Sequence, residues 1–266
     1  MPREAAPWIE RGARLGYAAK GIVYLVIGAL AALAAAGKGG QTTDSRGALR
    51  AIDASGPGHW LLLVLGAGLV GYAVWGVVGA TIDAERRGGD AKGLALRVGL
   101  AARGLAYGAL GIAAFRLFFT ARGSSGEGAE HWTGRLLGVP FGRALVIGAG
   151  IAIIGYALYQ FWRAARKNLR KRLHLAEAGP GGAAWVLRLA RFGIAARGVV
   201  FLVIGWFLVT AARTRDPSRA GGIADSLDAL RAQPYGALVL GTVAVGLMAF
   251  GVWELANARY RDINVR

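Results

Sequence analysis

Three long apolar stretches of this 266-residue chain each contain one embedded cation, and these cations are Lys20, Arg103 and Arg197. An ionised side chain at the centre of a bilayer costs about 2.5–3.5 kcal/mol on insertion scales, so it needs a partner or a route to water. Apart from Glu254, near the inner end of the last one, the six apolar stretches contain no aspartate or glutamate. The sequence therefore predicts that the three cations bind an anion, either a lipid phosphate or a solute.

Aromatic side chains accompany the cations. Tyr24, Tyr107 and Phe201 each lie four residues after a cation, on nearly the same helix face, where cation and ring can interact. Counted inward from Gly58, Gly142 and Gly236, three further aromatic pairs reach a similar depth: Tyr72 with Trp75, Tyr156 with Tyr159, and Phe250 with Trp253. The pattern predicts a basic and aromatic layer whose candidate anion- or lipid-binding residues are Lys20, Arg103, Arg197, Tyr24, Tyr107 and Phe201.

A second hypothesis explains the same residues without a ligand. Helical side chains tilt toward the N-terminus of their helix, so Lys20, Arg103 and Arg197 can extend to the nearer headgroups. The aromatic pairs would then form an interfacial belt. On this hypothesis the protein is a non-transporting structural or accessory membrane protein.

Catalytic chemistry finds no support in the residue types. The chain has no cysteine, and all six serines lie outside the apolar stretches, which argues against an intramembrane nucleophile. The three histidines, His59, His131 and His174, have no metal-ligand spacing. A proton or cation transporter would carry carboxylates inside the membrane. We therefore expect no enzyme activity, no metal site and no cofactor.

Composition predicts a membrane protein, because 55% of the residues are hydrophobic and the mean hydropathy is +0.43. A membrane-spanning helix needs about 20 mostly apolar residues. Six segments meet this requirement, at residues 15–36, 58–82, 97–119, 142–162, 191–212 and 236–257. The expected fold class is an all-α membrane protein with six transmembrane helices.

The six segments belong to a threefold internal repeat. The motif R-x-G-x-A-A-[KR]-G-x-x-[YF]-x-x-x-G begins at Arg14, Arg97 and Arg191. The repeats cover residues 8–83, 91–166 and 185–260 of a single transmembrane domain, 1–266. Each copy holds two spans and starts on the same side of the membrane, so the copies are parallel. We expect three helical hairpins related by a pseudo-threefold axis.

Glycines of the motif recur seven residues apart, which places them on one stripe of each helix. Small residues allow helix backbones to approach closely in lipid. We predict a packing role for Gly21, Gly28, Gly104, Gly111, Gly198 and Gly205.

Short segments connect the two spans of each repeat. Residues 44–52 and 224–231 have the pattern of amphipathic helices at the outer interface. The corresponding segment of the middle repeat, 124–139, is richer in glycine and is expected to be less regular.

Basic residues predict the orientation. The side that holds both termini carries 18 Lys and Arg, against 10 on the other side. By the positive-inside rule, both termini are cytoplasmic in a bacterial inner membrane. The basic run 163–172 is expected to contact anionic phospholipids, and no nucleic-acid partner is expected because no recognition module accompanies it.

The repeated first-helix motif, the amphipathic connector and the P-x-G or G-P-G entry to the second helix resemble a bacterial integral-membrane family. That family is built from three copies of a two-helix domain of unknown function, and the resemblance covers residues 8–260. It implies no catalytic or binding residues. Mitochondrial carriers also have three hairpins, but their P-x-[DE]-x-x-[KR] motif is missing from all three repeats here.

Overall fold

The computed structural model describes residues 5–81, 90–120, 129–166 and 179–260. Six long helices in these ranges are apolar and long enough to cross a membrane. They are α1 (Ala5–Ala35), α3 (Gly58–Thr81), α4 (Ala91–Thr120), α6 (Gly142–Ala165), α7 (Gly179–Thr214) and α9 (Gly236–Tyr260). The predicted all-α fold with six membrane-spanning helices is confirmed.

Three short helices connect the spans within each repeat: α2 (Ser45–Asp53), α5 (Ala129–Leu137) and α8 (Ile223–Arg231). Asp44 caps α2, because its carboxylate accepts a hydrogen bond from the Gly47 amide at 2.8 Å. The expectation that the middle connector is irregular is wrong for its described part, since α5 has the same length as α2 and α8. Residues 124–128 of that connector lie outside the described ranges.

The long helices pack in a cyclic order. The second helix of each repeat packs against the first helix of the next repeat, in the pairs α3 with α4, α6 with α7, and α9 with α1. Within the first and third repeats, α1 also packs against α3, and α7 against α9. Five of the six contacts expected of a pseudo-threefold bundle are therefore formed.

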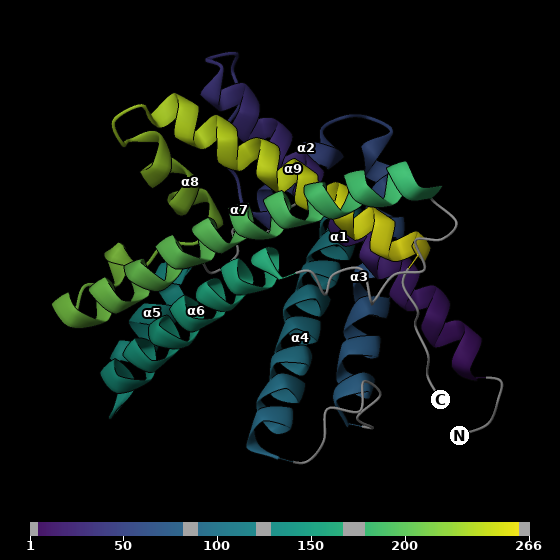
Figure 1. Ribbon diagram of the computed structural model, residues 1–266. Helices are drawn as coiled ribbons and strands as arrows, with labels where there is room; N and C mark the ends of the chain where they lie inside the picture. Colours follow the sequence, from purple (N-terminus) through teal and green to yellow (C-terminus); the bar gives the residue numbers. More distant parts are fainter. Residues whose placement is uncertain (1–4, 82–89, 121–128, 167–178, 261–266) are drawn as a thin grey trace.

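The sixth expected contact, between the two helices of the middle repeat, is missing from the described part of the chain. Helices α4 and α6 do not pack along each other there, and they diverge in Figure 1. The threefold arrangement is therefore interrupted at the middle repeat. One side chain accompanies the opening, because α6 has Ala152 where the first and third repeats have Gly68 and Gly246. A Cβ added to Gly68 would lie 3.2 Å from the side chain of Ala19, and one added to Gly246 would collide with that of Ala196.

The basic run after α6 lies mostly outside the described residues, which end at Arg166 and resume at Gly179. Of its described members, Arg166 stacks on the ring of Trp162, with its guanidinium carbon 3.9 Å from the ring centre. Trp162 is half exposed at the end of α6, as expected for an aromatic residue at the membrane interface.

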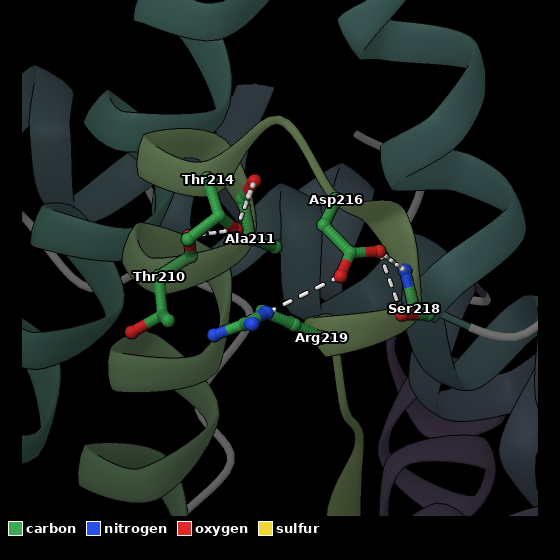
Figure 2. A network of polar contacts seen from close by, with 6 residues as sticks. All are labelled: Thr210, Ala211, Thr214, Asp216, Ser218 and Arg219. Atoms are coloured by element: carbon green, nitrogen blue, oxygen red, sulfur yellow. Dashed lines mark hydrogen bonds and ion pairs between the residues drawn. The ribbon is translucent and has the colours of Figure 1, made fainter.

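A compact turn leads from α7 to the one-turn 3₁₀ helix η3 (Pro217–Arg219) and then to α8 (Figure 2). The Asp216 carboxylate accepts hydrogen bonds from the amide and the hydroxyl of Ser218, and from Nε of Arg219 at 3.2 Å. The hydroxyl of Ser218, with help from Arg219, holds the pKa of Asp216 below its ordinary value. The turn brings η3 against α5 of the middle repeat, so the connectors of neighbouring repeats meet on this side of the molecule.

Candidate functional site

Lys20 forms a buried ion pair that the sequence did not predict. Its ammonium nitrogen, Nζ, lies 2.8 Å from Oε1 of Glu254, and both side chains are 5% exposed. The expectation that no carboxylate reaches the embedded cations is therefore wrong for Lys20. The reason is that α9 continues as a helix to Tyr260, which places Glu254 one turn beyond Phe250 on the buried face that meets α1.

Aromatic rings enclose the ammonium group of Lys20. Nζ lies 5.7 Å from the ring centre of Tyr72, 5.3 Å from that of Tyr107 and 5.2 Å from that of Phe250. At these distances the face of each ring attracts a cation. Carboxylate and rings together stabilise the charge of Lys20 inside the bundle.

Arg197 is equally buried but has no ion pair among the described residues. Its Nε donates a hydrogen bond to the hydroxyl oxygen of Tyr24 at 3.0 Å. Its guanidinium carbon lies 4.8 Å from the ring centre of Phe201 and 4.9 Å from that of Phe250. Arg197 is therefore held by aromatic side chains from three helices, α1, α7 and α9.

Arg103 differs from the other two cations. It is only partly buried, and within the described chain its one hydrogen bond runs from Nε to the carbonyl oxygen of Gly99 in its own helix, at 3.2 Å. A guanidinium carries five N–H donors, so most of its donors remain available. The positive charge of Arg197, in the same layer, repels that of Arg103. Arg103 is the embedded cation that is least neutralised in this layer.

The three cations have different neighbours at one position of the repeat. This position directly follows a repeated aromatic residue: Gly76 follows Trp75, Gln160 follows Tyr159, and Glu254 follows Trp253. Each lies on the second helix that packs against the first helix of the next repeat, so this position neighbours Arg103, Arg197 and Lys20 in turn. Sequence reasoning missed this position, although its signal was present: it differs in all three copies next to a repeated aromatic residue.

The three residues at this position present different chemical groups to the neighbouring cation. Glu254 neutralises Lys20. Gly76 offers no side chain, and a Cβ added to it would lie 3.0 Å from the Cα of Gly104, so the position is closely packed. Gln160 is fully buried, yet neither its amide nitrogen nor its amide oxygen has a hydrogen-bond partner among the described residues. Buried polar groups are normally hydrogen-bonded, so the amide of Gln160 requires a partner that the described part of the chain does not supply.

The aromatic residues follow the same cyclic order as the helices. Each first-helix ring packs edge-to-face on a second-helix ring of the preceding repeat, in the pairs Tyr24 with Phe250, Tyr107 with Tyr72, and Phe201 with Tyr156. Their ring centres are 4.8, 5.3 and 5.3 Å apart, respectively. Trp75 and Trp253 are buried rather than placed in an interfacial belt, whereas Tyr159 is exposed on α6. The layer thus contains three cations, one carboxylate and a ring of aromatic side chains.

The motif glycines lie where the helices of neighbouring repeats approach most closely. A Cβ added to Gly21 would lie 2.8 Å from the carbonyl oxygen of Gly251, and one added to Gly28 would lie 2.7 Å from that of Ala244. The other four face a neighbouring helix in the same way, with Gly104 and Gly111 against α3 and Gly198 and Gly205 against α6. These contacts set the spacing of the helices that carry the embedded cations.

Comparison with known proteins gives a family for this arrangement. Residues 15–83, 98–167 and 192–261 each match DUF1206, described as a domain of unknown function. The chain belongs to the DUF1206 family. A DUF1206 chain is thus three tandem copies of a two-helix unit, and the resemblance to a bacterial family of this architecture is confirmed.

A relative of this DUF1206 protein is the uncharacterized protein YxxB of Bacillus subtilis (strain 168). The two sequences are 34% identical over 263 residues, which cover 99% of this chain and 95% of the relative. No solved structure matches the chain. The comparisons name a domain of unknown function and assign no role to any residue, so the site has to be interpreted from its own geometry.

Proposed function

We propose that this protein binds an anionic phosphate-bearing group, a phospholipid headgroup or a small phosphate anion, at Arg103 in the basic and aromatic layer. The observation that carries the proposal is that Arg103 is embedded in a membrane-spanning helix and makes, among the described residues, a single hydrogen bond, to its own backbone. A cation at this depth needs a counter-charge. The described part of the layer holds three cations and one carboxylate, and that carboxylate contacts Lys20.

A guanidinium suits a phosphate ligand because its planar donors can bind two oxygens at once. Lys20 has a different role in this proposal. Its ion pair with Glu254 favours a structural function, as in the alternative of a structural or accessory membrane protein.

Arg103→Ala tests the proposal. We expect the variant to fold and to bind phosphatidylglycerol at least about tenfold more weakly than the wild-type protein, because a hydrogen bond to a charged group contributes about 1.5–3 kcal/mol. Arg103→Lys should retain part of the binding, since it keeps the charge but loses the planar fork. The measurement is native mass spectrometry during titration with phosphatidylglycerol and, separately, with inorganic phosphate. Equal binding of both ligands to the wild-type and alanine forms would refute the proposal.

We further infer that both termini are cytoplasmic in a bacterial inner membrane, because the side with the termini holds 18 of the Lys and Arg residues. The absence of native cysteine makes labelling decisive. A membrane-impermeant maleimide should modify Ala54→Cys, at the exposed end of α2, in intact cells. Ala165→Cys, exposed at the opposite end of α6, should react only after permeabilisation. If Ala165→Cys reacts in intact cells and Ala54→Cys reacts only after permeabilisation, the termini lie on the opposite side of the membrane.

A further inference from the structure

The middle repeat leaves open a helix surface that its neighbours bury. We call this surface the α4/α6 seam and define it by Gly99 and Ala102 on α4 and by Ala152 and Gly155 on α6. The corresponding residues of the first repeat pack together, with the Ala19 side chain 3.2 Å from a Cβ added to Gly68. In the third repeat a Cβ added to Gly246 would collide with the side chain of Ala196.

In the seam itself these contacts are absent. Ala102, Ala152 and Gly155 are exposed, and a Cβ added to Gly99 or Gly155 would meet nothing within 4 Å. Figure 1 shows the two helices diverging, and α4 and α6 do not pack along each other within the described ranges. In a membrane, a lipid can cover a helix surface that no described helix covers.

Arg103 lies at this seam. It follows Ala102 directly, and its Nε is bonded to the carbonyl oxygen of Gly99, so two of the seam residues adjoin it. On the α6 side, the seam residue Gly155 is followed directly by Tyr156, whose ring packs on Phe201 in the basic and aromatic layer. The Arg103 guanidinium, most of whose N–H donors are unused among the described residues, therefore lies where the helix bundle is open toward the bilayer.

The apolar side chains near Arg103 favour a ligand that has both a charged group and an apolar part. The helices beside the seam expose large apolar side chains, among them Leu105 on α4 and Ile151 on α6, which suit an acyl chain. A small phosphate ion would satisfy Arg103 but would not cover these apolar surfaces. A phospholipid with an anionic headgroup satisfies both, because its phosphate can reach the guanidinium while its chains remain in the bilayer.

On the basis of the proposed function, we infer that the ligand of Arg103 is an anionic membrane phospholipid that enters sideways from the bilayer through the α4/α6 seam. Its phosphate binds Arg103, and an acyl chain lies between α4 and α6. The seam is a feature of the middle repeat, so one lipid binds per protein chain. Free phosphate is not held at this site on its own.

Blocking the seam tests this inference without removing the charge. Ala152→Trp fills the seam with a large side chain at an exposed position, so the fold has no buried contact to lose there. Leu158→Trp is the matched control on the same helix. Leu158 and its equivalents Val74 and Val252 are exposed in all three repeats, so this position faces lipid outside the seam.

The variants are placed in phosphatidylcholine nanodiscs that contain phosphatidylglycerol, and native mass spectrometry counts the phosphatidylglycerol retained on each protein. We expect one bound molecule on the wild-type protein and on Leu158→Trp, and about a tenfold or greater loss of affinity for Ala152→Trp. Inorganic phosphate should bind to none of the three.

The outcomes separate the inference from the proposed function. If Arg103→Ala abolishes lipid binding while Ala152→Trp leaves it intact, the lipid enters elsewhere and the seam inference is wrong. Arg103-dependent binding of inorganic phosphate without phosphatidylglycerol would likewise overturn the inference while supporting the anion site. If Ala152→Trp abolishes lipid binding but Arg103→Ala does not, the seam binds lipid without Arg103, and both the inference and the proposed function fail.

Discussion

Replacing Glu254 with alanine is expected to lower the free energy of unfolding by about 3–5 kcal/mol, because it leaves the Lys20 ammonium buried without its counter-charge. Nζ of Lys20 and Oε1 of Glu254 are 2.8 Å apart and both side chains are buried, so neither charge can reach solvent in this fold. Thermal unfolding in detergent micelles measures the effect as a lower transition midpoint. The loss should far exceed that of substitutions on the lipid-facing surface.

Two variants control this prediction. Glu254→Gln keeps the shape of the side chain but removes its charge, so it should also destabilise the protein strongly. The double variant Lys20→Met and Glu254→Met removes both charges and should recover most of the stability, because apolar replacements of a buried pair are often neutral or stabilising. An unchanged midpoint for Glu254→Ala would mean that the ion pair is not buried as described.

Alanine at Gly16 or Gly193 is expected to destabilise the protein by about 1–3 kcal/mol, whereas alanine at the equivalent Gly99 should not. A Cβ at Gly16 would collide with the side chain of Tyr72, and one at Gly193 would collide with the backbone of Phe250. Gly99 has nothing within 4 Å of an added Cβ. Alanine there should be neutral or stabilise α4 by up to about 1 kcal/mol through its higher helix propensity.

The three variants test directly whether α4 and α6 are apart at the seam, because the three glycines occupy the same place in the repeat and differ only in their neighbours. Thermal unfolding of the three single variants under identical detergent conditions provides the measurement. Equal destabilisation at all three positions would show that α4 and α6 pack like the helices of the other two repeats.

The architecture could be predicted from the sequence because its determinants are local. Membrane-spanning helices follow from uninterrupted apolar stretches, and the repeat follows from the motif beginning at Arg14, Arg97 and Arg191. Spacing within one helix also predicted the contact between Arg197 and Phe201. The same spacing failed at Lys20, whose rings are Tyr72, Tyr107 and Phe250 of other helices rather than Tyr24.

The pairing between repeats could not be predicted in the same way. That Glu254 meets Lys20 depends on α9 packing against α1, which lie at opposite ends of the chain. Spacing within one helix carries no information about such a contact. The open α4/α6 seam was not predicted, because its four residues are all small and small residues normally indicate close helix packing. Its one signal in the sequence is Ala152, which replaces the glycine of the other two repeats, Gly68 and Gly246.

The protein extracted with its own lipids shows whether Arg103 holds a phosphate-bearing membrane ligand. Native mass spectrometry would compare the wild-type protein with Arg103→Gln after gentle extraction from the producing membrane. We expect one phosphorus-containing lipid retained per wild-type chain and none on the variant, with both proteins folded. A wild-type protein that carries no such lipid, or a variant that carries as much, would overturn the assignment of a phosphate ligand to Arg103.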